Sequence, residues 1–346
     1  MNQTIKQMNT ERYEEFFYSS RIVQVHPTLR CNLACKHCYS SSLPAYRDAL
    51  NVSELNRFLE YAYDEGYNIV SVSGGEPFIY GELKELFQFT KKIGFTNVVA
   101  SNGMLLGSEK SKQILDYVDL IAVSIDGKPE LHNKIRGSEK AFDKMLSGVE
   151  IIKTKNIPFG FIHSITNESW DSLLWLGEFA QDNGAKLLQL HPLEMYGRAV
   201  NEMPDYALDQ TLLHKIFFLA TYLKSKYEPE IFIQLDFLHR EYIREFPQSV
   251  NVISNSTADK QLSEIINSII IDENGDVLPV GYGFSKKYQI GSIRNTNNIK
   301  NMFADFTATK LNKLLALFEQ AYNQIISDQE IDLVNWNELI IKMSNN

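Results

Sequence analysis

Short apolar runs alternate with amphipathic segments from about residue 22 to about residue 200. The runs are rich in Val, Ile, Leu and Phe, which is typical of parallel strands covered on both faces. The predicted strands are Ile22–Val25, Ile69–Val72, Val98–Ala100, Leu120–Ile125, Phe159–Ile165 and Leu187–Leu190. Between them apolar residues recur at helical spacing, as at Leu55, Phe58, Leu59, Ala62 and Tyr63. Six such units predict an α/β fold, a partial (β/α)6 TIM barrel two units short of closure.

The pattern changes after Gly197-Arg198-Ala199. A helix is predicted at about 206–226 and a strand at Ile231–Leu235. A β-hairpin is predicted around the turn Asp272–Gly275, because Asn-Gly between two apolar runs favours a tight turn. Its strands are Ser268–Ile271 and Asp276–Leu278.

The chain therefore divides into three predicted parts. Residues 1–20 form a short helical lead-in, residues 21–200 the partial barrel, and residues 201–346 a C-terminal α+β extension that ends in helices at about 297–344.

Composition narrows the class of protein. The chain has 346 residues, 44% of them hydrophobic, and a formal net charge of −9. The absence of a long Lys/Arg block argues against nucleic acid as the main partner. No apolar run approaches the roughly 18 residues that span a bilayer, and the polar N-terminus lacks a signal peptide core. We predict a cytoplasmic protein without membrane partners.

The three cysteines of the chain, Cys31, Cys35 and Cys38, lie within eight residues of one another. They follow the first predicted strand, and sites of parallel β/α folds form at such strand ends. An odd count argues against a disulfide framework and favours a metal. Three thiolates would leave one iron of a [4Fe–4S] cube open. The alternatives are a Cys₃His zinc site that includes His37, and thiols without metal.

Cys31-x₃-Cys35-x₂-Cys38-Tyr39, followed by Gly74-Gly75-Glu76-Pro77, resembles the radical S-adenosylmethionine (SAM) superfamily over about residues 20–200. The resemblance implies one [4Fe–4S] cluster whose open iron binds S-adenosyl-L-methionine. The cluster would then cleave SAM reductively to a 5′-deoxyadenosyl radical that abstracts hydrogen from a substrate. It also implies oxidoreductase-type chemistry and a flavodoxin- or ferredoxin-type electron donor.

The same resemblance assigns SAM-binding residues at successive strand ends. Gly74 and Gly75 would accept the SAM amino group, with Glu76 and Pro77 shaping the loop. The other predicted positions are Tyr39, Ser101, Asn102, Ser124, Asp126, Arg136 and Asn167. Ser124 would bind the ribose or carboxylate, Arg136 the carboxylate through its guanidinium fork, and Asn167 would flank the adenine.

Several of these residues have structural alternatives. Ser101-Asn102-Gly103 also suits a simple turn, and Asp126 also suits a residue that ties down its loop. Arg198 is interpreted as an organiser of its own loop. His26, His163 and His191, near strand ends, are interpreted as structural.

The segment Ser268–Arg294 resembles the start of a SPASM extension, which carries auxiliary iron–sulfur clusters in peptide-modifying relatives. Val280 stands where that pattern has Cys, and no cysteine remains to hold a further cluster. The resemblance is therefore to a SPASM-like or Twitch-like scaffold without auxiliary clusters. The absence of a fourth thiol excludes a cysteine hydrogen donor.

The GRA and SPASM-like features favour a ribosomal peptide substrate. The predicted reaction is a crosslink or another modification at an unactivated carbon. The alternatives are dehydration or rearrangement of a small molecule such as a sugar or an amino acid, and a non-catalytic metal-binding scaffold.

Overall fold

A computed structural model describes residues 20–252, 260–296 and 298–346. Its main feature is a ten-stranded sheet with the order β11-β10-β9-β1-β2-β3-β4-β5-β6-β7. The strands are β1 (Ile22–Val25), β2 (Ile69–Val72), β3 (Thr96–Ser101), β4 (Leu120–Ser124), β5 (Phe159–Ile165), β6 (Leu187–Pro192), β7 (Phe232–Leu235), β9 (Ser268–Ile271), β10 (Asp276–Pro279) and β11 (Gly291–Ser292). Strands β1 to β7 are parallel to one another, and β9 runs parallel to β1.

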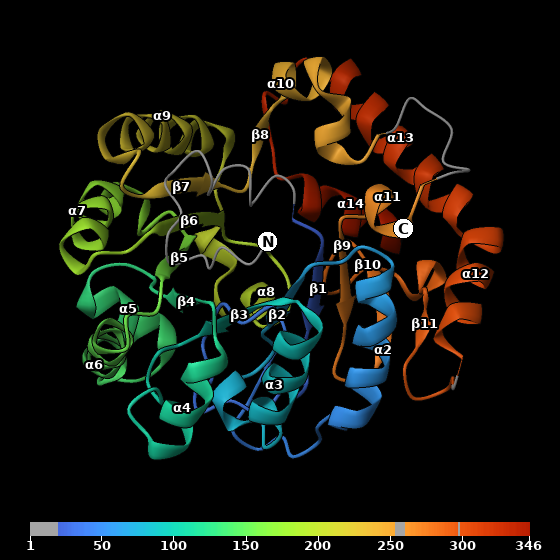
Figure 1. Ribbon diagram of the computed structural model, residues 1–346. Helices are drawn as coiled ribbons and strands as arrows, with labels where there is room; N and C mark the ends of the chain where they lie inside the picture. Colours follow the sequence, from blue (N-terminus) through green and yellow to red (C-terminus); the bar gives the residue numbers. More distant parts are fainter. Residues whose placement is uncertain (1–19, 253–259, 297) are drawn as a thin grey trace.

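Helices cover the outer face of this curved sheet (Figure 1). Those of the β/α units are α2 (Val52–Asp64), α3 (Leu83–Ile93), α4 (Glu109–Ile114), α5 (Pro129–Arg136), α6 (Ala141–Thr154), α7 (Leu173–Asn183), α8 (Ala199–Glu202) and α9 (Gln210–Tyr227). The later ones are α10 (Arg240–Glu245), α11 (Leu262–Ile265), α12 (Ile299–Thr309), α13 (Leu311–Ser327) and α14 (Trp336–Asn345). A two-stranded sheet pairs β8 (Leu238–His239) with β12 (Leu333–Val334). Within the described ranges no helix is long and apolar enough to cross a membrane.

The predicted α/β fold with its partial barrel is confirmed. Three of the six predicted strands have the predicted bounds, β3 and β6 extend further, and β4 ends one residue earlier. The predicted hairpin is also present as β9 and β10, with Gly275 at φ +83°.

The sheet does not stop at the sixth strand, as six β/α units alone would suggest. Strand β7 pairs parallel with β6, and β9 pairs parallel with β1, so both edges of the barrel sheet are extended by residues after 200. The predicted lead-in at residues 1–20 lies almost wholly outside the described residues.

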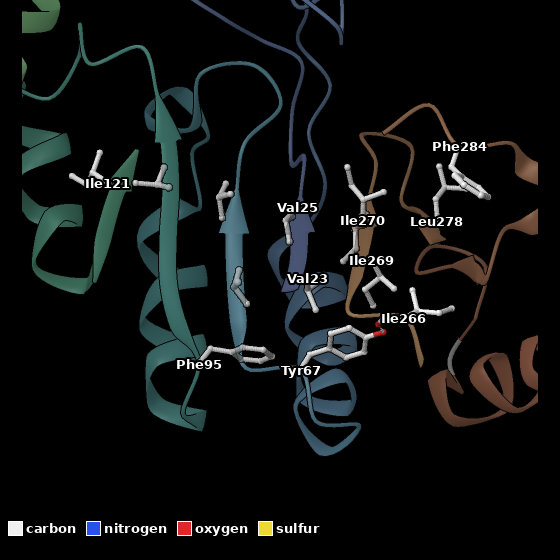
Figure 2. Close-up of a cluster of buried hydrophobic side chains, with 14 of the residues drawn as sticks. Val23, Val25, Tyr67, Phe95, Ile121, Ile266, Ile269, Ile270, Leu278 and Phe284 are labelled. Carbon is white, nitrogen blue, oxygen red and sulfur yellow. Dashed lines mark hydrogen bonds between the residues drawn. The ribbon is translucent and has the colours of Figure 1, made fainter. Parts of the chain in front are cut away.

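One core joins the barrel to the extension. Val23 and Val25 of β1 pack with Ile269 and Ile270 of β9, all with exposed fractions of 0% (Figure 2). The buried hydroxyl of Tyr67 donates to the Ile266 carbonyl oxygen at 2.9 Å. Burial of such aliphatic side chains stabilises a fold by roughly 1.5–3 kcal/mol each, so the extension is part of the structure that positions the end of β1.

Candidate active site

The cysteine loop connects β1 to α2 at the edge where the parallel strands end. Cys35 is buried, Cys31 and Cys38 are half-buried, and none is in a disulfide. Burial, helped by the neighbouring charges of Glu76, Cys35 and Cys38, raises the pKa of Cys31 to about 12. The three sulfurs are therefore close enough to oppose one another's ionisation, and a cationic group between them would favour the thiolates.

The donor set fits a cube better than a single ion. Among the described residues no three His, Cys, Asp or Glu side chains converge on one ion position, as a zinc site requires. His37, the fourth ligand in the zinc hypothesis, has Nε2 at 2.9 Å from Asp126 Oδ1. A [4Fe–4S] cube binds each thiolate through a different iron, so its sulfurs need not converge. The geometry therefore does not support the Cys₃His zinc hypothesis.

The Gly74-Gly75 loop packs directly against the chain that enters the cysteine loop. The Gly75 and Glu76 amides donate to the Thr28 and Arg30 carbonyl oxygens at 2.9 and 3.0 Å. A Cβ atom on Gly75 would lie 2.2 Å from the Arg30 carbonyl oxygen, which is far closer than a non-bonded carbon atom can approach. The close packing against the cysteine loop thus requires a glycine at position 75, whether or not this residue also contacts a ligand.

We expect Gly75→Ala to disrupt cluster loading. The added methyl group would collide with the backbone of Leu29 and Arg30, which cannot rotate away as a side chain can. The segment that leads to Cys31 would therefore have to shift. Iron and sulfide content per chain after anaerobic reconstitution should fall severalfold. Gly81→Ala is the matched control, because its Cβ would meet nothing within 4 Å. Full loading of Gly75→Ala would contradict this assignment.

Glu76 joins the second strand end to the third. Its buried carboxylate accepts hydrogen bonds from Ser101 Oγ at 2.9 Å and from the Asn102 amide at 3.0 Å. Burial raises the pKa of Glu76 despite these donors. Pro77 begins the short 3₁₀ helix η2 (Pro77–Ile79). The Asn102 side chain in turn donates to Asn32 Oδ1 in the cysteine loop at 2.8 Å, so this group of predicted residues forms one bonded assembly.

Asp126 and Arg136 bind each other. Arg136 Nε and Nη2 donate to the two carboxylate oxygens of Asp126 at 2.5 and 3.2 Å, and His37 contacts the same carboxylate. Although burial opposes ionisation, Arg136 and His37 hold the pKa of Asp126 well below its usual range. The Arg136 guanidinium, which the resemblance assigns to the SAM carboxylate, thus binds Asp126. Through its contact with His37, Asp126 links the loop after β4 to the cysteine loop.

The remaining predicted residues have three different environments. Ser124 ends β4, is half-buried, and its hydroxyl makes no hydrogen bond within the described part of the chain. The Tyr39 hydroxyl lies 3.2 Å from both His26 Nε2 and Ser73 Oγ. Asn167 is exposed, and its amide donates to the Asp205 carbonyl oxygen at 2.6 Å. Among the described residues, the hydroxyl of Ser124 and the amide oxygen of Asn167 thus have no hydrogen-bond partner, and of these two Ser124 is the half-buried one at a strand end.

Arg198 holds the cysteine loop, a role that the sequence interpretation missed. Its Nε and Nη1 donate to the carbonyl oxygens of Cys35 and Ser42 at 2.8 and 2.9 Å, and its amide donates to the Cys38 carbonyl at 3.1 Å. A Cβ on Gly197 would lie 2.3 Å from the Tyr39 carbonyl oxygen. The Gly197-Arg198-Ala199 motif was the available signal, but it did not indicate which loop Arg198 binds.

We expect Arg198→Met to lower cluster content and SAM affinity together, because it removes two donors to the cysteine loop while keeping an unbranched chain. Iron content and SAM binding by equilibrium dialysis measure the two effects. Arg47→Met is the control, since Arg47 is exposed and, within the described ranges, its side chain donates to the carbonyl oxygens of Pro44 and Tyr46 alone. An Arg198→Met protein with normal iron content and SAM affinity would contradict this role.

The extension also reaches the site. The Tyr282 ring lies 4.9 Å from the His26 ring and 5.4 Å from the Tyr39 ring, centroid to centroid. Val280, with φ +69°, precedes it at a reversal of the chain after β10. Tyr39 directly follows Cys38, so Tyr282, two positions after Val280, packs against the residue next to the last cysteine. No sequence signal pointed to Tyr282.

Residues 25–180 match the family model of the radical SAM superfamily. This match identifies residues 25–180 as a radical SAM domain, the kind of domain whose cofactors are a [4Fe–4S] cluster and SAM.

Relatives with different substrates share this domain. The chain is 28% identical over 182 residues to an AdoMet-dependent heme synthase of Oleidesulfovibrio alaskensis, covering 52% of this chain and 47% of that protein. It is 27% identical over 185 residues to the sporulation killing factor maturation protein SkfB of Bacillus subtilis, covering 53% and 45%. The chain thus spans about half the length of these relatives.

The fold likeness is more extensive. The crystal structure of Streptococcus suis SuiB bound to S-adenosylmethionine superimposes with a TM-score of 0.66 at 15% identity, covering 89% of this chain and 71% of that one. SuiB has also been solved bound to the precursor peptide SuiA. The likeness shows that the extension, and not the barrel alone, has a counterpart of known fold.

Proposed function

We propose that the chain is a radical SAM enzyme that abstracts hydrogen from a ribosomally made peptide and so modifies an unactivated carbon. The observation that carries the proposal is the cysteine loop, which is held at the end of β1 by separate contacts from Gly75, Asp126 and Arg198. The peptide substrate is supported by the SkfB match and by the SPASM-like extension around Tyr282.

When bound, the cluster and SAM supply the 5′-deoxyadenosyl radical. The residues of the chain hold the reactants. Cys31, Cys35 and Cys38 would bind three irons and leave the fourth for SAM. Arg136 and Asp126, a buried pair, would fix the cysteine loop so that this open corner keeps its orientation. Ser124 would donate from the end of β4 to the SAM ribose or carboxylate.

Incubation with candidate peptides tests the proposal. Reduced holoenzyme and SAM are mixed with short peptides encoded beside the gene, and both the peptide mass and 5′-deoxyadenosine are measured. We expect one peptide to change mass in a reaction that depends on SAM and reductant, and the Cys35→Ser protein to give none. A sugar or nucleoside that reacts while every such peptide stays unchanged would contradict the peptide substrate.

A small-molecule substrate is the second candidate. The face of the sheet opposite the helices is called the inner face. Along β4 to β7 it carries six half-buried residues: Ser124, Ile162, Ser164, Gln189, His191 and Gln234. Five of these six carry polar groups, and polar walls suit a compact polar ligand as well as a peptide backbone. The match to a heme synthase supports the same candidate. The experiment above separates the two.

A further inference from the structure

A polar cluster lies at the ends of β6 and β7, apart from the cysteine loop. His191 Nδ1 is 2.9 Å from Asp236 Oδ2. Gln189 and Gln234, which are partners in the β6–β7 register, each donate to the same carboxylate at 2.8 Å. Asp236 therefore accepts two hydrogen bonds and forms an ion-pair contact with His191, and its side chain is only 16% exposed.

These contacts fix the imidazole of His191 and leave one edge of it free. The His191 side chain is 36% exposed, and its Nε2 has no partner among the residues that the structure describes. His191 faces Ser164 across the β5–β6 register, on the same inner face as Ser124.

The charges near His191 indicate the kind of ligand. Although burial opposes protonation, Asp236 and, more weakly, Glu194 raise the pKa of His191 to about 9, so the ring is a cation and both nitrogens are donors at neutral pH. Asp236 and Glu194 together outweigh its single positive charge, which disfavours an anionic ligand. The ligand that suits His191 is therefore a neutral oxygen acceptor, and the carbonyl oxygen of a peptide bond is such an acceptor.

We propose that His191, held by Asp236, is a substrate-positioning residue that donates a hydrogen bond from Nε2 to a backbone carbonyl oxygen of the peptide. The inference rests on the proposed function, since it assumes a peptide substrate. It differs from the sequence interpretation of His191 as structural, and it assigns one substrate contact to the inner face.

Steady-state kinetics of two His191 variants test the inference, with the peptide encoded beside the gene as the probe. His191→Phe keeps an aromatic ring without donors, and His191→Gln keeps a neutral donor. We expect His191→Phe to raise KM for the peptide about tenfold to a hundredfold, as befits a lost hydrogen bond to a charged group, with kcat nearly unchanged. His191→Gln should recover part of the loss. SAM affinity and peptide-independent SAM cleavage should stay at wild-type values in both.

His214→Phe is the matched control, because His214 pairs with Asp332 at 3.5 Å on the exposed part of α9, and it should not change KM. An unchanged KM in His191→Phe overturns the inference. So does a fall in kcat at constant KM, a loss of SAM affinity, or no recovery in His191→Gln. If the wild-type protein modifies no peptide, the proposed function fails first and the inference fails with it. A failure of the inference alone leaves wild-type turnover intact.

Discussion

Cys35→Ser should remove the iron–sulfur cluster and with it all reductive cleavage of SAM. Cys35 is the most buried of the three cysteines, and Arg198 holds its carbonyl oxygen in place. A serine hydroxyl stays protonated near neutral pH and is a poor ligand for iron, so the cube would lose one of only three protein bonds. Iron content, visible absorbance and 5′-deoxyadenosine after dithionite reduction measure the loss.

Ala34→Ser is the matched control, because Ala34 is exposed in the same loop and the same hydroxyl is introduced. It should keep its cluster and its SAM cleavage. Wild-type iron content in Cys35→Ser would show that the thiol of Cys35 is not a cluster ligand.

Asp126→Asn should destabilise the chain strongly. The substitution leaves the Arg136 guanidinium, which is 7% exposed, without its counter-charge, and breaking a buried pair in this way costs about 3–5 kcal/mol. Urea unfolding of the metal-free protein at neutral pH measures the loss. Asp116→Asn is the control, since Asp116 and Lys155 form an exposed pair, and such pairs contribute about 0–1 kcal/mol.

The pH dependence of this loss has a definite sign. Because the folded chain depresses the pKa of Asp126, the pair stabilises the fold above the carboxyl's unfolded pKa of about 4 and loses that contribution as the pH falls further. The difference between wild type and Asp126→Asn should therefore be constant near neutrality and shrink in acid. A difference that grows in acid, or a neutral loss as small as that of Asp116→Asn, would contradict the assignment of a buried ion pair.

The barrel could be predicted from the sequence because each strand is a short segment rich in apolar residues that ends at a polar loop. The pairing of the C-terminal extension with the barrel sheet could not be predicted from the sequence. Strand β9 is as apolar as its neighbours, but nothing within Ser268–Ile271 shows that it pairs with β1. That choice follows from the core shared by Val23, Val25 and Ile269.

The site could be predicted as a set of loops, but not as a set of contacts. The cysteines and Gly74-Gly75 are local motifs, and the structure brings them together. Arg136 binds Asp126 because the loop after β4 lies close to the end of α5. The spacing of residues in the sequence does not reveal that distance. Arg198 lies 163 positions from Cys35, and Tyr282 reaches Tyr39 only because the chain reverses at Val280.

The central claim is that Cys31, Cys35 and Cys38 hold one iron–sulfur cube with an open corner for SAM. Electron paramagnetic resonance of anaerobically reconstituted, dithionite-reduced protein, recorded with and without SAM, tests it most directly. The account predicts a reduced-cluster signal that changes when SAM is added, followed by formation of methionine and 5′-deoxyadenosine. Colourless protein with no signal after reduction, and SAM that stays intact, would contradict it.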